Sequence, residues 1–371
     1  MQFNQLWSLV GAASWLFSDI VCAKTYTIPN SANPGSQNIE YIAKATEFDG
    51  QKITPYPNSN SYEWWYFDAV SSTTQESVTI VFFETLGTTF PTSSDSYLSI
   101  QFAGTLEDGS YFIYAVPAKN TSVATVTTSG NGASGVWQDT GFSFEGSSTM
   151  TKYTVEVDND EFGIYGTFVL NSVSPAHGPC GPACAGANEK LFNHVGWANA
   201  VPDANTVVNM TVNGSALQFN GYGYHDKNWG DTVFTDVVQS WYWGHGRLGP
   251  YSIVWFDALD TSGVEHTSGY ITKGSTVIES SCASGSVVAR PYGANADYPP
   301  QPSSGVPTGF DITFNTGTIG TVQVQATVET IQIPGVAGTT YGRYIGPLSG
   351  TVAGKNYTGT ALFEQFKFAS S

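Results

Sequence analysis

The chain has 371 residues, a formal net charge of −17 and an aromatic content of 14%. Only 13 lysines and arginines stand against 30 acidic residues, and they form no cluster, so neither nucleic acid nor an anionic membrane surface is an expected partner. The length suits two β-domains, and beyond the first residues no segment is long and apolar enough to span a bilayer.

The first 23 residues are predicted to be a secretory signal peptide. They contain an apolar run that ends in Val21-Cys22-Ala23, just before Lys24. Four Asn-x-Ser/Thr sequons follow, at Asn120, Asn209, Asn213 and Asn356. We expect cleavage near Ala23 and a glycan on at least one of these asparagines. The chain is therefore predicted to be secreted or to lie in the secretory pathway.

Residues 63–68, Glu-Trp-Trp-Tyr-Phe-Asp, are predicted to form a β-strand. Alternation places Glu63, Trp65 and Phe67 on one face and the other three residues on the opposite face. Each face then carries aromatic surface beside one acid. A bulky barrel core is the plain interpretation, but an acid is costly to bury unless it is paired or used. We therefore expect Glu63 or Asp68 to line a ligand cavity.

Short alternating runs dominate the first half, and helical periodicity is almost absent. The strands predicted there are Tyr62–Ser71, Ser77–Thr85, Tyr97–Leu106, Ser110–Ala118, Tyr153–Val157 and Gly163–Asn171. A loop rich in Gly, Pro and Ala covers residues 174–188. A hairpin of residues 207–212 and 216–224 follows, turning at Asn213-Gly214.

Three cysteines remain once Cys22 leaves with the signal peptide. Cys180 and Cys184 lie in the Gly/Pro/Ala loop, and we favour a small disulfide ring between them. One of the pair bonding to Cys282 is the alternative. The nearby His177 also suggests a metal site, but zinc prefers four ligands at tighter, paired spacings, so no metal is predicted.

A second segment, residues 221–231, places His225 beside Asp226. An imidazole titrates near neutrality and a carboxylate fixes its tautomer, so the pair is a candidate proton donor and acceptor. Adjacent strand residues face opposite ways, so the two side chains need not touch. A polar turn that caps backbone groups is an equally good interpretation.

The second half repeats the β-pattern from about residue 236. The strands predicted there are Gln239–Leu248, Tyr251–Leu259, His266–Thr272, Thr276–Ser281, Phe310–Phe314, Thr321–Thr330, Tyr341–Val352 and Thr358–Phe368, and eight strands suffice for an up-and-down barrel. We therefore divide the mature chain into domains 24–235 and 236–371.

A third aromatic segment opens this second half. Trp241, Trp243, His245 and Arg247 share one strand face. They form either an aromatic cavity wall with a cation at its mouth or barrel core with a stacked arginine. No nucleophile elbow, Gly-rich phosphate loop, HExxH motif or Ser/His/Asp arrangement accompanies them.

Together the three segments resemble the carotenoid hydratase-like (hydroxyneurosporene synthase-like) family, and within it the fungal Diels–Alderases. The resemblance implies an all-β fold of two lipocalin-type domains with the pocket between them, lined in some members by the acid that corresponds to Glu63. The second motif maps onto His225, Asp226 and Trp229, while Lys227 replaces a histidine that is frequent in the family. The leader and sequons resemble members linked to hetero-Diels–Alder coupling of a tropolone quinone methide with humulene-type terpenes.

The function expected from the resemblance is a cofactor-independent hetero-Diels–Alder reaction between a terpene olefin and an electron-poor heterodiene. The predicted catalytic residues are Glu63, His225, Asp226 and His245. The predicted substrate-binding residues are Trp65, Tyr66, Phe67, Asp68, Phe83, Trp229, Trp241 and Trp243. No metal or organic cofactor is expected, and the sequence carries no signal for an oligomeric state.

Three other classes fit the same composition. A lipocalin-like carrier shares the aromatic pocket, and a hydratase or isomerase acting on a terpenoid shares its acids. A glycan-active β-sandwich requires paired carboxylates at a sugar-binding cleft.

Overall fold

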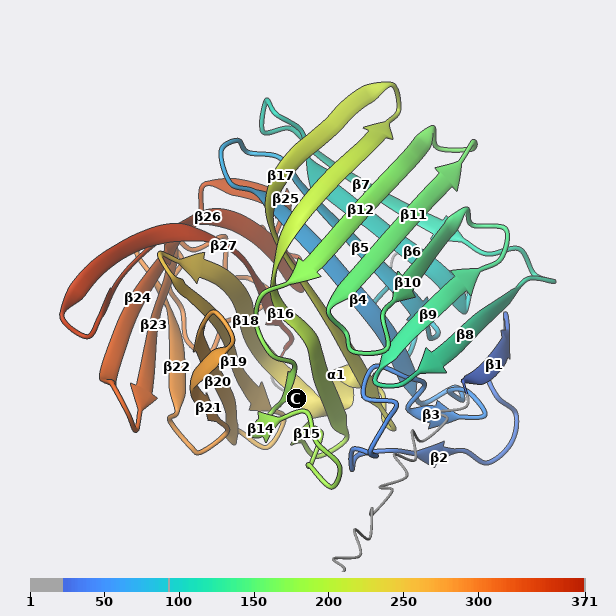
Figure 1. The fold of residues 1–371 in the computed structure, drawn as a ribbon, viewed down its shortest axis with the longest axis horizontal. Coiled ribbons are helices and arrows are strands. Elements are labelled where there is room, and N and C mark those ends of the chain that lie inside the picture. The colour runs from blue at the N-terminus through green and yellow to red at the C-terminus, as the bar shows by residue number, and fades with distance from the viewer. Residues whose placement is uncertain (1–22, 93, 370–371) are drawn as a thin grey trace, which may run out of the picture.

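The computed structural model describes residues 23–92 and 94–369, so the predicted signal peptide, except for Ala23, lies outside the described residues. The described chain is mainly β-strand with antiparallel pairing in its sheets, and its helix α1 (Phe234–Val237) has only four residues (Figure 1). The predicted all-β fold is confirmed. The strands form two large sheets that lie against each other.

The first sheet has 15 strands and curls around the N-terminal core. In spatial order its main path is β1 (Lys24–Pro29), β8 (Val123–Ser129), β9 (Gly132–Trp137), β10 (Phe142–Gly146), β11 (Lys152–Asn159), β12 (Ile164–Ser172), β16 (Val195–Val212), β17 (Ser215–Gly230), β4 (Tyr62–Ser71), β5 (Ser77–Glu84), β6 (Leu98–Thr105) and β7 (Tyr111–Pro117). The short strands β13 (His177–Gly178), β14 (Gly181–Pro182) and β15 (Lys190–Phe192) attach beside β16. A separate two-stranded sheet joins β2 (Asn38–Ile39) and β3 (Ile53–Thr54).

The second sheet has ten strands and contains the rest of the chain. In spatial order its main path is β21 (Thr276–Ser281), β20 (Glu265–Lys273), β19 (Tyr251–Asp260), β18 (Val238–Leu248), β27 (Lys355–Lys367), β26 (Tyr341–Val352), β24 (Gly320–Thr327), β23 (Gly309–Thr316) and β22 (Val287–Tyr292), and β25 (Thr330–Ile333) pairs with β26. The connection between the sheets runs from β17 through α1 to β18, and the predicted division at residue 235 falls within it.

Several strands differ from those predicted. The predicted hairpin around Asn213-Gly214 is the tip of a much longer pair, because β16 has 18 residues and β17 has 16. The second half contains β22 and β25 in addition to the eight strands expected. In the first half β1, β8, β9 and β10 were not predicted, although β8 alternates buried and partly buried positions, which is the usual signature of a half-buried strand.

The buried side chains form three clusters, one inside each curled sheet and one between the sheets. Alternation along β4 divides its aromatic residues: Trp65 and Phe67 pack in the N-terminal core, whereas Trp64 and Tyr66 pack between the sheets. Every residue of β4 is buried, because both of its faces are covered. The apolar layer between the sheets therefore comes from ordinary strand alternation.

A disulfide joins Cys180 to Cys282, and Cys184 is free and exposed. The predicted ring between Cys180 and Cys184 is therefore wrong. The loop that carries Cys180 lies against the second sheet, where the side chains of Ser268 and Tyr270 donate hydrogen bonds to its backbone carbonyls. Docking of this loop brings together two cysteines that are 102 residues apart in sequence.

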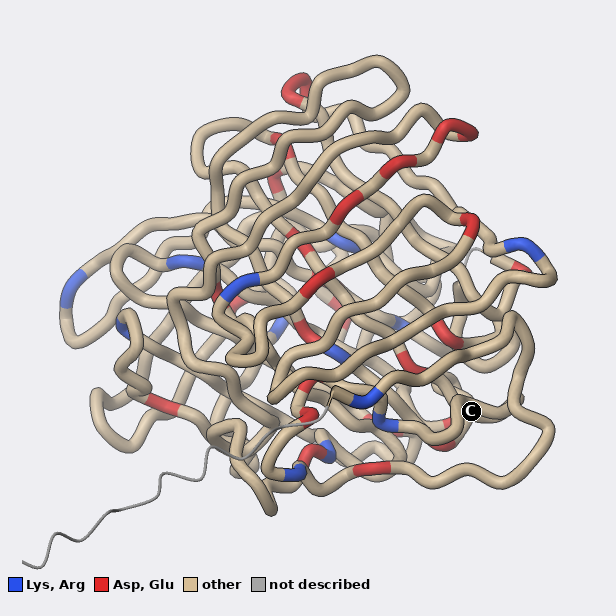
Figure 2. The backbone as a smooth tube through the Cα atoms, turned by 45° about the vertical axis from the view of Figure 1, so that its right-hand side comes forward, with Lys and Arg blue, Asp and Glu red and all other residues tan. Residues whose placement is uncertain are grey.

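Lysine and arginine positions are scattered along the folded backbone among the more numerous acids (Figure 2). Within the described residues no helix has the length and hydropathy needed to cross a membrane. The four sequon asparagines are all exposed, and their glycosylation stays a prediction.

Candidate functional site

A pocket lies in the layer between the two sheets. Its cavity has a volume of about 50 Å³. The lining residues are Trp64, Tyr66, Val81, Phe83, Phe90, Pro91, Gln101, Asp226, Asn228, Trp241, Trp243, Tyr341, Arg343, Glu364 and Phe366. Small-molecule sites usually have volumes of about 300–1,000 Å³. The lining side chains must therefore move apart to admit a substrate.

The first sheet supplies one wall from β4 and β17. These strands pair with Tyr66 opposite Asp226 and with Trp64 opposite Asn228. Side chains at paired positions lie on the same face of a sheet, so two aromatic rings, an acid and an amide project together. The second sheet supplies the facing wall.

In that facing wall the register of β18, β27 and β26 groups apolar and charged side chains. Trp241 and Tyr341 are both paired with Phe366, and Arg343 is paired with Glu364. The pocket therefore combines an aromatic end with a charged end, and both lie in a buried layer.

Asp226 is an acid in the pocket wall whose burial favours its neutral form. Trp197 Nε1 and the Tyr224 hydroxyl both donate hydrogen bonds of 2.7 Å to its Oδ2 atom. Burial nevertheless raises its pKa to about 7, and these two donors only partly oppose the effect. A substantial fraction of Asp226 is thus protonated near neutrality, as a general acid requires.

A second acid, Asp68, lies behind the wall. Its Oδ2 atom accepts a hydrogen bond of 2.8 Å from the Tyr66 hydroxyl and lies 2.9 Å from His245 Nε2. The His245 ring stacks on Tyr224, with centroids 4.4 Å apart. Tyr66 reaches the pocket itself, whereas Asp68 and His245 support the residues that line it.

The charged end of the pocket is built around Arg343. Its guanidinium lies 5.1 Å above the Tyr66 ring, and its Nε donates a long hydrogen bond of 3.4 Å to Glu364. The Tyr341 hydroxyl donates to the same Glu364 oxygen at 2.5 Å. Burial raises the pKa of Glu364, and Arg343 partly offsets this rise.

Three polar groups that line the pocket have no partner among the residues that the structure describes. They are Nδ2 of Asn228 and the Nε1 atoms of Trp241 and Trp243, and all three atoms are buried. An unpaired buried N–H costs about 1–3 kcal/mol, which an acceptor on a ligand recovers. The pocket therefore suits a small, flat, largely apolar molecule that carries carbonyl or ether oxygens.

Comparison with known proteins identifies the family. The model of the Diels-Alderase-like family matches residues 39–292. A quinolone epoxide rearrangement protein of Emericella nidulans is 37% identical over 340 residues, which cover 90% of this chain and 91% of the relative. The chain belongs to the Diels-Alderase-like family.

Two further comparisons agree with this membership. A Diels-Alderase of an Acremonium species is 26% identical over 225 residues, covering 57% of this chain and 54% of that protein. The crystal structure of CghA with Sch210972 matches with a TM-score of 0.76 at 14% identity, covering 94% of this chain and 99% of that one. The resemblance to the fungal Diels–Alderase branch is confirmed.

Among the residues predicted for the site, five line the pocket: Tyr66, Phe83, Asp226, Trp241 and Trp243. Their catalytic and binding roles stay predictions. In this family member the rings of Tyr66 and Trp243 meet edge to face across the two sheets, with centroids 5.3 Å apart. The interface therefore brings together residues that are almost 180 positions apart in sequence.

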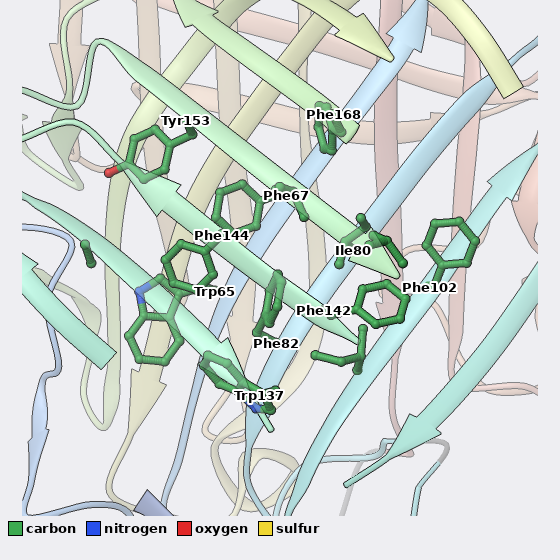
Figure 3. Close-up of a cluster of buried hydrophobic side chains, with 14 of the residues drawn as sticks. Trp65, Phe67, Ile80, Phe82, Phe102, Trp137, Phe142, Phe144, Tyr153 and Phe168 are labelled. Carbon is green, nitrogen blue, oxygen red and sulfur yellow. The ribbon is translucent and has the colours of Figure 1, made fainter. Parts of the chain in front are cut away.

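Five other predicted site residues face the opposite way, into the N-terminal half of the molecule. They are Glu63, Trp65, Phe67, His225 and Trp229. Figure 3 shows Trp65 and Phe67 among the aromatic residues of that core. Trp65, predicted to bind substrate, therefore does not line the pocket, and Trp64 lines it together with Trp241 and Trp243.

Glu63 and His225 each have a complete set of buried partners. Glu63 accepts hydrogen bonds from the backbone N–H groups of Lys52 and Ile53 and from the Lys227 ammonium. His225 Nδ1 lies 2.9 Å from the Tyr66 carbonyl oxygen, and its ring stacks on Phe67. Both residues face away from the pocket, so the geometry gives no support to the catalytic role predicted for them.

Sequence reasoning missed the contribution of β26 and β27. Arg343 and Glu364 each stand in a stretch of strand whose residues are all buried, 342–346 in β26 and 361–367 in β27. A charged residue on the buried face of such a strand is the signal that identifies them, because burying a charge is costly unless it is paired or used. In the described part of the chain, no group of three or more His, Cys, Asp and Glu side chains is arranged to hold a metal ion.

Proposed function

We propose that the protein is a cofactor-independent enzyme that isomerises an aromatic, oxygen-bearing small molecule by acid-assisted rearrangement of an epoxide. The observation that carries this proposal is Asp226, a buried acid with a pKa of about 7 in the wall of an aromatic pocket. Relatives at 37% identity that are named quinolone epoxide rearrangement proteins support an epoxide on a quinolone scaffold as the substrate.

The chemistry needs one proton and no external electrons. Asp226 gives its proton to the epoxide oxygen while one C–O bond breaks and leaves a cationic carbon. A neighbouring group then migrates to that carbon with its bonding electrons, and the protonated carbonyl returns the proton to Asp226. Substrate and product are isomers, so the cycle balances without an oxidant or reductant.

The aromatic walls suit such an intermediate. The faces of Trp64, Trp241 and Trp243 offer negative electrostatic potential to a nearby cation, and Trp is the best side chain for this contact. The buried layer also limits the access of water, which otherwise opens an epoxide to a diol. Asn228 and Trp241 supply N–H groups for a substrate carbonyl.

The direct test is to incubate the protein with a quinolone that carries an alkenyl epoxide and to analyse the products by mass spectrometry. We expect a product of unchanged mass. Asp226→Asn lowers the rate by about 10²–10⁴-fold, the usual contribution of a general acid. The exposed Asp311→Asn is the matched control, with an unchanged rate. Recovery of substrate or diol at the protein-free rate contradicts the proposal.

The pH dependence gives a second readout. Only the protonated form of Asp226 acts as the acid, so kcat falls as the pH rises through about 7. A rate that increases steadily through this range contradicts an acid role.

A second candidate is the hetero-Diels–Alder coupling predicted from the sequence. It is favoured by the relatives named Diels-Alderase and by the unpaired N–H groups, because a hydrogen bond to an electron-poor heterodiene lowers the barrier. Its test is incubation with the terpene olefin and a precursor of the tropolone quinone methide. An adduct whose yield and isomer ratio equal those of the protein-free reaction rejects this candidate.

Product mass separates the remaining classes. Rearrangement leaves the mass unchanged, a hydratase adds one water, and cycloaddition joins two molecules. A carrier binds its ligand and releases it unaltered.

A further inference from the structure

The segment from residue 174 to residue 182, here called the strap, ties the first sheet to the second. Tyr270 and Ser268 of β20 donate hydrogen bonds of 2.6 Å to the carbonyls of Pro175 and Pro179. The strap's Cys180 is bonded to Cys282, which follows β21. On its other side the strap pairs with β16 through a bridge between His177 and Asn199. The strap is therefore fixed at both sheets.

His177 is the buried centre of the strap. Its ring stacks on Tyr270 with centroids 3.7 Å apart and meets the Trp197 indole edge to face at 5.2 Å. Nδ1 lies 2.9 Å from the carbonyl oxygen of Gly178. Burial lowers the pKa of His177 to about 4, so the ring is neutral at physiological pH and acts as a flat spacer between the other two rings.

Trp197 connects this spacer to the pocket. Its indole also contacts Phe256 of β19 edge to face, with centroids 5.3 Å apart. The N–H group of the same indole donates the 2.7 Å hydrogen bond to Asp226. The orientation of that donor thus depends on contacts from the strap and from the second sheet.

We propose that the strap is a positioning element, in which His177 holds the indole N–H of Trp197 on the carboxyl group of Asp226. His177 and Trp197 are positioning residues, because neither lines the pocket. The catalytic meaning of this arrangement rests on the proposed function, whereas the structural coupling does not.

The sign of the expected effect follows from the hydrogen bond. An N–H donor stabilises the ionised carboxylate more than the neutral acid, so losing it raises the pKa of Asp226. A hydrogen bond to a charged group is worth about 1.5–3 kcal/mol, which corresponds to a rise of about one to two pKa units.

The other polar groups around Asp226 come from each element packed against it, and all are retained in the variants. They are Tyr224 on β17, Tyr66 on β4, Tyr341 and Arg343 on β26, Glu364 on β27 and His225 on the opposite face of β17.

The experiment measures the titration of Asp226 without any substrate. Infrared difference spectra against Asp226→Asn isolate the carbonyl stretch of the protonated acid, which is followed as a function of pH. The variants are Trp197→Phe, His177→Ala and His177→Phe, and thermal unfolding shows that each one is folded. We expect an upward shift of one to two units for Trp197→Phe and a smaller upward shift for His177→Ala. We expect His177→Phe to titrate like the parent protein, because phenylalanine keeps both ring contacts.

Variants of the cysteines test the same proposal independently, because the disulfide is one attachment of the strap. Cys282→Ser releases one attachment of the strap and is expected to shift the titration upward, while Cys184→Ser leaves it unchanged, because Cys184 is exposed and unbonded. Overlapping titrations for the parent, Trp197→Phe and His177→Ala overturn the proposal. Shifted titrations in a protein without rearrangement activity leave the positioning role standing and reject the proposed function instead.

Discussion

Asp226 and its sequence neighbours face opposite sides of β17. Asp226 points into the layer between the sheets, while His225 and Lys227 point into the N-terminal half of the molecule. Adjacent residues therefore have different surroundings. Asp226 lines the aromatic pocket, whereas Lys227 forms an ion pair with the buried carboxylate of Glu63. Because successive side chains of a strand point to opposite faces, a residue's role depends on which of the two faces its position places it on.

Replacing Trp241 by phenylalanine tests the unpaired donors. The substitution keeps an aromatic ring in contact with Phe256 and Phe366 but removes the buried N–H. A net hydrogen bond of about 0.5–1.5 kcal/mol corresponds to a loss of about 2–12-fold in kcat/KM for a carbonyl-bearing substrate. Steady-state kinetics with such a substrate measure this loss in kcat/KM. An unchanged kcat/KM in a correctly folded variant argues against a hydrogen bond from Trp241 to the substrate.

Replacing Lys227 by methionine tests the ion pair with Glu63. Both side chains are fully buried, and the ammonium lies 3.3 Å from the Trp65 ring centroid. Removing one partner leaves an uncompensated buried charge, so we expect a loss of about 3–5 kcal/mol in the free energy of unfolding, measured in urea.

The double variant Lys227→Met/Glu63→Gln is the control for this loss. It no longer carries the unpaired charge and recovers part of the stability. The folded fraction of either variant should retain kcat, because this pair faces away from the pocket. A collapse of kcat in folded Lys227→Met restores the catalytic role that the sequence suggested for Glu63.

The strands that build the site are those buried on both faces. β4 and the second half of β17 are fully buried, and β18 is buried at all but two positions, because one face packs in a curled sheet and the other packs between the sheets. Strands with two buried faces carry continuous aromatic and apolar runs, as β4 and β18 do, or buried polar and charged residues, as the second half of β17 does. The three segments that stand out in the sequence are therefore the strands at the interface.

Gly244 of β18 shows how tightly such a strand packs. A Cβ atom there would overlap the ring of Trp255 and the Cβ of Phe363. We expect Gly244→Ala to lower the free energy of unfolding by about 1–3 kcal/mol, the usual cost of overpacking a core. Urea titration measures it, with Gly317→Ala as the matched control, because nothing lies within 4 Å of that added carbon. If Gly244→Ala and Gly317→Ala have the same free energy of unfolding, the tight packing around Gly244 is contradicted.

At the scale of the whole molecule, burial raises the pKa of several carboxyl groups, so that they stay protonated near neutral pH. Burial raises the pKa of Asp226 to about 7 and that of Glu84 to about 8, whereas both titrate near 4 in the unfolded chain. The folded state then holds more protons than the unfolded state, so stability from these groups is greatest at low pH and is lost as the pH rises through 7–8.

The free energy of unfolding should therefore fall by about 2–3 kcal/mol between pH 6.5 and 8.5. Below pH 6.5 the depressed pKa of His177 acts in the opposite sense, because its unfolded form then takes up a proton that the folded form does not. Urea unfolding at the two pH values measures the change. The double variant Glu84→Gln/Asp226→Asn is expected to show a much flatter dependence. If the free energy of unfolding of the parent protein is the same at both pH values, the raised pKa values of Glu84 and Asp226 are contradicted.

The sequence by itself determined the all-β class, the negative net charge and three of the strands that line the pocket, β4, β17 and β18, because alternation and aromatic content are local properties. It also predicted Asp226, Trp241 and Trp243 as site residues, and all three line the pocket. Only the tertiary structure decided which face of β4 and β17 meets the second sheet, since both faces are buried and aromatic.

The tertiary structure also decided the cysteine pairing and the charged end of the pocket. Cys180 reaches Cys282 because the strap docks on β20, a contact between segments about 100 residues apart. Arg343, paired with Glu364 in the second sheet, lies over Tyr66 only when the two sheets pack together. Such long-range packing leaves no periodic trace in the sequence, because it depends on how two complete sheets fit together.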